Sequence, residues 1–118
     1  MNDEIDLTVD QTFNLAVQNH QNKNFQDAQN YYQKVLKIDP NHSAALNNLG
    51  AIYQIIKDHQ KAKECYEKAI EINPNYADAY NNLGVIFKEL EENQKAKECF
   101  EKAIEINPNY ADAYNNLG

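Results

Sequence analysis

One asparagine recurs at a fixed interval along the chain, and its spacing is the clearest indication of a chemical function. It occupies every 34th position, at Asn14, Asn48, Asn82 and Asn116, a set that we call the asparagine ladder. A side-chain amide can donate a hydrogen bond to a carbonyl and accept one from an N–H. Because a peptide main chain offers both groups, a row of amides could hold an extended peptide segment by its backbone.

Two further sets of residues follow the same interval beside the ladder. Small apolar residues lie three positions after it, and acidic residues lie four positions before it at Asp10, Asp78 and Asp112. We expect the apolar set to form a floor that admits peptide side chains, and the acidic set to form a lip. The predicted peptide-binding groove therefore consists of Asn14, Val17, Asn48, Ala51, Asn82, Val85 and Asn116.

The remaining residue types do not indicate catalysis. The sequence has no nucleophile–base pair, no metal-ligand cluster and no Gly-rich phosphate loop, so we expect no enzyme activity, no metal and no cofactor. Cys65 and Cys99 occupy equivalent positions in successive units, and stacked helices lie about 8 to 10 Å apart, beyond the roughly 7 Å limit for a disulfide. We predict free thiols there. We interpret His20, His42 and His59, which fall at three different unit positions, as solvated surface residues.

The charge balance limits the partners. The chain has 18 acidic residues against 11 lysines and no arginine, which gives a formal net charge of −7 and a pI near 4.8. This balance opposes binding to nucleic acid or anionic membranes, and the missing arginine disfavours acidic ligands. A neutral or basic partner segment is favoured. The N-terminus is acidic where a signal peptide would be basic, and no apolar run approaches a membrane span, so we expect a cytoplasmic protein.

The elements that must position the ladder follow from an internal repeat. Residues 60–84 return as residues 94–118 with one difference, Tyr66 against Phe100, and prolines keep the same interval at positions 40, 74 and 108. Within each unit, apolar residues recur at three- and four-residue steps in two segments, and no segment alternates with period two. Each unit is therefore predicted to be a helical hairpin that ends at proline, in an all-α fold.

These residues resemble the tetratricopeptide repeat family. The family pattern of large, Leu, Gly, Tyr, Ala, aromatic, Ala and Pro is matched at its characteristic spacing by the second unit, with Leu46, Leu49, Gly50, Tyr53, Ala62, Tyr66, Ala69 and Pro74. The third unit matches it with Tyr80, Leu83, Gly84, Phe87, Ala96, Phe100, Ala103 and Pro108. The resemblance implies a right-handed α-solenoid of about seven helices. It also implies one array over 1–118, with a divergent first repeat at 9–42, repeats at 43–76 and 77–110, and the start of a fourth at 111–118.

The resemblance carries expectations about small residues and about both ends of the array. We expect Gly50 and Gly84 to permit close approach of the second helix at Ala62 or Ala96. The hairpin turn, where the family often has glycine, carries Lys23, Lys57 and Glu91 instead. The chain stops after eight residues of the fourth unit, which suggests a fragment or a truncated array. Apolar groups near Phe100 should then lack partners and favour head-to-tail self-association with the first hairpin of another copy.

The ladder itself resembles that of the peptide-binding superhelix of O-linked N-acetylglucosamine transferase. Asparagine at this position also occurs in generic repeats of the family, where it bonds to neighbouring backbone, and for any single Asn the two interpretations weigh about equally. The carboxylate clamp of chaperone-binding members requires Lys and Asn in the first unit, where this chain has Phe13 and Val17. It requires Lys and Arg in the third unit, where this chain has Asp78 and Asn82, so only Asn48 of the second unit matches. Capture of an acidic chaperone tail is therefore disfavoured.

Three functions remain open from the sequence. The leading hypothesis is a protein-interaction module that binds an extended peptide in its concave groove. The second is a regulatory or substrate-recruiting array of a larger enzyme, such as a glycosyltransferase. The third is a self-stacking structural scaffold, which the near-identity of the second and third units favours.

Overall fold

The computed structural model describes residues 7–118, and the acidic segment 1–6 lies outside the described residues. Residues 7–118 form no strand and seven helices: α1 (Val9–Gln21), α2 (Phe25–Ile38), α3 (Ser43–Ile55), α4 (His59–Ile72), α5 (Ala77–Glu89), α6 (Asn93–Ile106) and α7 (Ala111–Leu117). The all-α prediction is confirmed. In this part of the chain, every helix is too short or too polar to cross a lipid bilayer.

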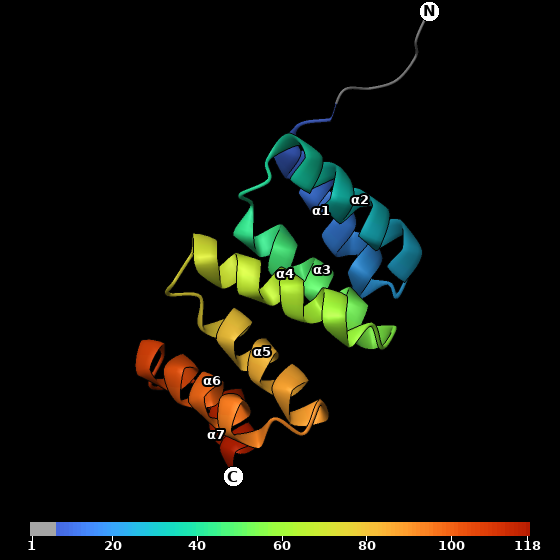
Figure 1. Ribbon diagram of the computed structural model, residues 1–118. Helices are drawn as coiled ribbons and strands as arrows, with labels where there is room; N and C mark the ends of the chain where they lie inside the picture. Colours follow the sequence, from blue (N-terminus) through green and yellow to red (C-terminus); the bar gives the residue numbers. More distant parts are fainter. Residues whose placement is uncertain (1–6) are drawn as a thin grey trace, which may run out of the picture.

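The helices pack as successive hairpins in an elongated stack of 57 × 25 × 21 Å. The tightest pairs are α1 with α2, α3 with α4, and α5 with α6, and each pair packs on the next (Figure 1). α1 and α7 lie at opposite ends of the stack (Figure 1). The fold is therefore the predicted solenoid, in which each hairpin buries its apolar face against its neighbours.

Each second helix ends where the proline period predicts. The helices stop at Ile38, Ile72 and Ile106, and the residue before each proline has left the helical conformation, with φ near −128°. That residue is Asp39, Asn73 or Asn107, and its side chain accepts a hydrogen bond from the backbone N–H two residues later, at 3.2 to 3.3 Å. Proline and the short polar side chain thus turn the chain into the next hairpin.

The turn inside each hairpin has a left-handed residue that is not glycine. Lys23, Lys57 and Glu91 have φ of 64°, 68° and 62°. Around Lys57, the backbone N–H of Asp58 bonds to the carbonyl of Tyr53 at 2.8 Å, and that of Lys57 bonds to the carbonyl of Gln54 at 3.1 Å. This pair of bonds is a Schellman motif, which ends a helix with one residue in the left-handed region. The hydrogen bonds offset the steric cost that glycine would avoid.

One aromatic ring per hairpin fills the core against a glycine. Tyr32, Tyr66 and Phe100 occupy the same position of α2, α4 and α6 and are at most 2% exposed. A Cβ added at Gly50 would lie 2.7 Å from the Tyr66 ring, and one added at Gly84 would lie 2.5 Å from the Phe100 ring. The atoms that a Cβ would meet first thus belong to these rings, so each glycine makes room for the aromatic ring of the second helix. Phe100 is 2% exposed, so this ring itself does not lack partners.

Candidate functional site: the face of the first helices

The first helices of successive hairpins form one side of the stack, which we call the inner face. α3 contacts α5 and α5 contacts α7, whereas α2, α4 and α6 contact chiefly first helices. In a curved stack, the row of helices that approach one another more closely is expected on the concave side. The ladder asparagines lie on α1, α3, α5 and α7, and therefore on this row of helices.

The structure places three of the four ladder residues at intermediate depth. Asn14 is exposed, whereas Asn48, Asn82 and Asn116 are half-buried. The small apolar residues of the predicted floor are also half-buried, and Val17 and Val85 pack against the edge of the hydrophobic core. Six of the seven predicted groove residues are therefore half-buried, and a peptide-binding groove formed by them stays a prediction.

Two ladder amides have partners that the sequence did not indicate. Asn82 Nδ2 donates to Asn47 Oδ1 at 3.1 Å, and Asn116 Nδ2 donates to Asn81 Oδ1 at 2.9 Å. Asn47 and Asn81 precede Asn48 and Asn82 in sequence and are buried, with 7% and 6% exposure. Each bond joins the first helices of neighbouring hairpins. Each donating amide keeps its second N–H and its oxygen for other partners.

The first junction between hairpins is built differently. Phe13 stands where Asn47 and Asn81 stand in the later units, and its ring stacks on that of His42 with centroids 4.8 Å apart. Burial raises the pKa of Tyr32 to about 12, and an interaction with Asn48 partly opposes this rise. The ladder is thus chemically uneven along the groove.

The acidic lip is brought together only in part. Asp78 and Asp112 line one shallow hollow of about 330 Å³ between α5 and α7, together with Tyr110, whereas Asp10 lies on α1. Burial, followed by a hydrogen bond to Asp78, raises the pKa of Tyr110. The tyrosine therefore stays neutral, and the hollow keeps the negative potential of its two carboxylates.

The three histidines are not solvated surface residues as expected. His20 Nδ1 lies 3.1 Å from the hydroxyl of Tyr32, and burial lowers the pKa of His20. The Nδ1 atom of His42 accepts a hydrogen bond from a backbone N–H in the first turn of α3. His59 Nε2 pairs with Glu89 Oε2 at 2.6 Å and links α4 to α5. Each ring thus has a structural partner, which periodicity alone could not reveal.

The cysteines behave as predicted. Both are free, with Cys65 buried and Cys99 half-buried. Burial, followed by the charge of the adjacent Glu64, raises the pKa of Cys65 to about 12, and burial with nearby carboxylates raises that of Cys99 to about 11. The thiols are therefore protonated at neutral pH and are poor nucleophiles. Within residues 7–118, no three His, Cys, Asp or Glu side chains are grouped to hold a metal ion.

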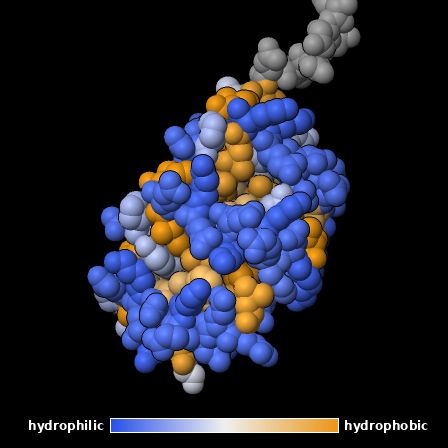
Figure 2. Space-filling view, in the orientation of Figure 1, coloured by the Kyte–Doolittle hydropathy of each residue, from blue (hydrophilic) through white to orange (hydrophobic). Residues whose placement is uncertain are grey.

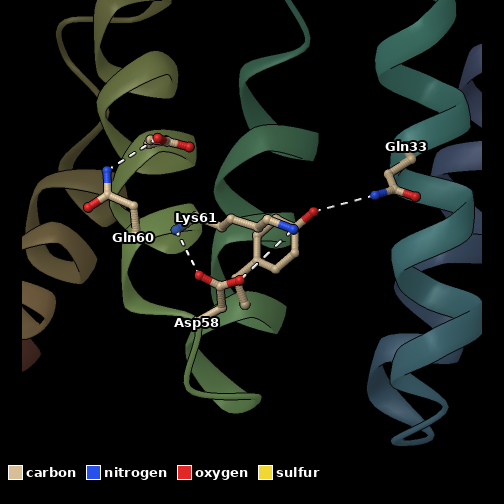
Figure 3. Close-up of polar contacts among 6 residues, drawn as sticks. Gln33, Asp58, Gln60 and Lys61 are labelled. Carbon is tan, nitrogen blue, oxygen red and sulfur yellow. Dashed lines mark hydrogen bonds and ion pairs between the residues drawn. The ribbon is translucent and has the colours of Figure 1, made fainter.

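The seams at which each second helix packs on the next hairpin provide the other notable surface. Gln33 of α2 points across to α3, where its Nε2 donates to the hydroxyl of Tyr53 at 3.4 Å (Figure 3). Lys61 lies beside Asp58 at the start of α4, with its Nζ 5.5 Å from the centre of the Tyr53 ring (Figure 3). In the view of Figure 2, hydrophilic side chains predominate and hydrophobic ones gather in patches between them.

The next seam, between α4 and α6, contains a hollow of about 430 Å³. Its lining mixes both charges with aromatic residues: Lys63, Glu67, Tyr80, Phe87, Lys95, Glu98 and Cys99. Lys63 and Lys95 lie over the Phe87 ring, with Nζ 5.7 and 5.6 Å from its centre. Cations that cover an aromatic face in this way stabilise the seam. The seam offers no unbroken row of one chemistry, in contrast to the inner face.

Comparison with known proteins agrees with the geometry. The family model for the tetratricopeptide repeat matches residues 8–74 and 43–109. The crystal structure of MamA is 30% identical, with a TM-score of 0.87 over 93% of this chain and 64% of MamA, so this chain spans less than two thirds of that protein. The Sgt2 TPR domain from Aspergillus fumigatus is 28% identical, with a TM-score of 0.86 over 92% and 74% of the two chains. No curated protein matches the chain significantly.

A third structure is similar in fold alone. The first TPR of Spaghetti (RPAP3), solved with the HSP90 peptide SRMEEVD, is 23% identical, with a TM-score of 0.88 over 92% of this chain and 86% of that one. Domains of this kind generally mediate protein–protein interactions and are mostly not catalytic. With the family model matching most of the sequence and the fold in agreement, this chain belongs to the tetratricopeptide repeat family.

Proposed function

We propose that the chain is a protein-interaction module that binds an extended segment of a partner protein along its inner face. The observation that carries the proposal is the repetition of one amide, at Asn14, Asn48, Asn82 and Asn116, on four successive first helices. An extended peptide presents carbonyl and N–H groups at regular intervals, which such amides can bind without reading its side chains. The likeness to the asparagine ladder of O-linked N-acetylglucosamine transferase supports the same mode of binding.

The small residues beside the ladder would determine which peptide side chains fit into the groove. Val17, Ala51 and Val85 are half-buried and apolar, so they leave room for peptide side chains above them. Affinity would then come from main-chain hydrogen bonds, and selectivity would come from the size of the side chains that face this floor.

Charge favours a neutral or basic segment. The chain carries a net charge of −7, and Asp78 and Asp112 share one hollow next to the ladder. The RPAP3 structure has an acidic peptide bound, but its likeness to this chain is one of fold. Here Phe13, Asp78 and Asn82 stand where a carboxylate clamp needs cations, so the acidic tail that suits RPAP3 should be repelled.

A self-stacking scaffold is the second candidate, and one observation favours it. Tyr114 and Leu117 of α7 are 50% and 39% exposed, and Leu117 lines a hollow of about 240 Å³ with Ala96 and Phe100. An apolar residue from another copy would fit there. Sedimentation that stays monomeric at high concentration would remove this candidate. If the chain belongs to a larger enzyme, the same inner face would serve to recruit its substrate.

The decisive experiment is a peptide array probed with the wild-type chain and a double variant, Asn48→Ala with Asn82→Ala. We expect the double variant to bind the selected peptides more weakly by about 1 to 3 kcal/mol. A matched control replaces two exposed asparagines away from the inner face, Asn30→Ala with Asn75→Ala, and should bind as the wild type does. Unchanged affinity in the ladder variant, together with a large fall in melting temperature, would make the ladder purely structural.

A further inference from the structure

A second row of asparagines lies beneath the ladder, one position earlier in each unit. It consists of Asn47 and Asn81, which are more than nine-tenths buried although their side chains are fully polar. A buried amide is stable only when its polar atoms are satisfied. The Oδ1 of each accepts the N–H of the ladder residue of the next unit, Asn82 or Asn116.

Burial also restricts the movement of Asn47, which is 7% exposed. An acceptor enclosed in this way cannot swing away from its donor into solvent. The bond to Asn82 therefore has a defined direction, and so has the amide that donates it.

This direction matters for a peptide-binding amide. The terminal torsion of an asparagine side chain is broad and nearly two-fold, so a free amide presents N–H and oxygen interchangeably. Once one N–H is committed to Asn47, the second N–H and the oxygen of Asn82 point in fixed directions. A binding group that is already oriented loses less conformational entropy when its ligand arrives.

We propose that Asn47 and Asn81 are positioning residues that orient the ladder amides of Asn82 and Asn116 toward the main chain of a bound peptide. The inference rests on the proposed function of the inner face. Under this proposal, the amides of Asn82 and Asn116 are oriented before the peptide binds. The amide of Asn48 is adaptable, because Phe13 occupies the position at which Asn47 and Asn81 provide an acceptor in the later units. The register of the peptide is then set in the C-terminal half of the groove.

The test uses the full chain and a short synthetic peptide selected from the array by the wild-type protein. We expect Asn47→Leu to weaken binding by about fivefold or more, because the Asn82 amide loses its acceptor. Asn47→Asp keeps an oxygen at the same place and should restore most of the affinity. The matched control is Asn115→Leu, at the equivalent but exposed position, which should leave binding unchanged.

A double-mutant cycle separates positioning from general damage. In an Asn82→Ala background the amide to be oriented is gone, so Asn47→Leu should cause no further loss of affinity. Equal losses in both backgrounds, or no loss in either, would overturn the inference. A wild-type chain that retains no peptide from the array would instead overturn the proposed function.

A readout without peptide tests the orientation itself. In the wild type, the Asn82 side-chain N–H that bonds to Asn47 should exchange with solvent more slowly in NMR spectra than the corresponding N–H of Asn14. Asn47→Leu should remove that difference. If Asn82 exchanges as fast as Asn14 in the wild type, its amide is not held and the inference fails.

Discussion

Replacing Gly84 by alanine tests the packing that sets the distance between the two helices of a hairpin. The new Cβ would lie 2.5, 2.8 and 2.9 Å from three carbons of the Phe100 ring, closer than carbon atoms pack. Phe100 is 2% exposed, so the ring cannot turn into solvent to relieve the overlap. The helices must separate or the ring must leave its rotamer, and both disturb the packing of α5 against α6.

The magnitude follows from two opposing effects. An overlap this close with a buried ring places the overpacking cost in the upper part of its usual range, at about 2 to 3 kcal/mol. Exchanging glycine for alanine inside a helix gains about 1 kcal/mol, so we expect a net loss of about 1 to 2 kcal/mol. For a domain of this size, the loss corresponds to a fall in melting temperature of about 4 to 8 °C. Gly50→Ala should behave alike, since its Cβ would lie 2.7 Å from the Tyr66 ring.

Thermal unfolding followed by circular dichroism measures the effect. Gly118→Ala is the matched control, because a Cβ there meets nothing closer than 3.6 Å and should change little. In a Phe100→Leu background, Gly84→Ala should be neutral or stabilising, because leucine has no ring that overlaps with the new Cβ. An increase in melting temperature for Gly84→Ala alone would show that the ring yields freely, and the packing argument would be refuted.

Three other predictions concern the turns, the ligand and the titrating groups. Lys57→Gly should raise the free energy of unfolding by about 0.5 to 1 kcal/mol in urea titrations, because glycine removes the steric cost of a φ of 68°; a destabilised variant would contradict this. A peptide ending in Glu-Glu-Val-Asp should bind more weakly than a lysine-containing one in fluorescence anisotropy, and salt should weaken the basic peptide; tight, salt-independent binding of the acidic peptide would be inconsistent with the charge argument. The free energy of unfolding should fall as pH rises from about 10 to about 12, because burial raises the pKa of Tyr32 from 10.0 to about 12 and the folded state keeps a proton that the unfolded state has lost; a Tyr32→Phe variant should lose this part of the pH dependence.

The sequence predicted the fold well because its signals are local and repeated. Apolar residues at helical spacing define the helices, and Pro40, Pro74 and Pro108 define where the second helix of each hairpin ends. Both effects act within a few residues along the chain. Because the same hairpin repeats every 34 residues, the sequence predicts one continuous stack of hairpins. The prediction of free thiols at Cys65 and Cys99 succeeded for the same reason, since the period alone separates them.

Partners across the stack could not be read from the period. Periodicity placed the ladder on the first helices, but it gave no reason to pair Asn82 with Asn47, 35 residues away, because that bond depends on how closely α3 approaches α5. The histidines were misjudged for a similar reason. His42 and His59 have partners supplied by helix termini and neighbouring hairpins, which have no signature in sequence spacing.

The sequence by itself determined the number of hairpins, the ends of the second helices, and the residue types that line each face, because these depend on backbone sterics and local periodicity. Only the tertiary structure decided that the glycines accommodate the rings of Tyr66 and Phe100, and that two ladder amides are tied to buried asparagines of the preceding unit. Both are contacts between surfaces that meet only after the hairpins stack. Their geometry depends on the spacing and crossing of whole helices, which no local pattern encodes.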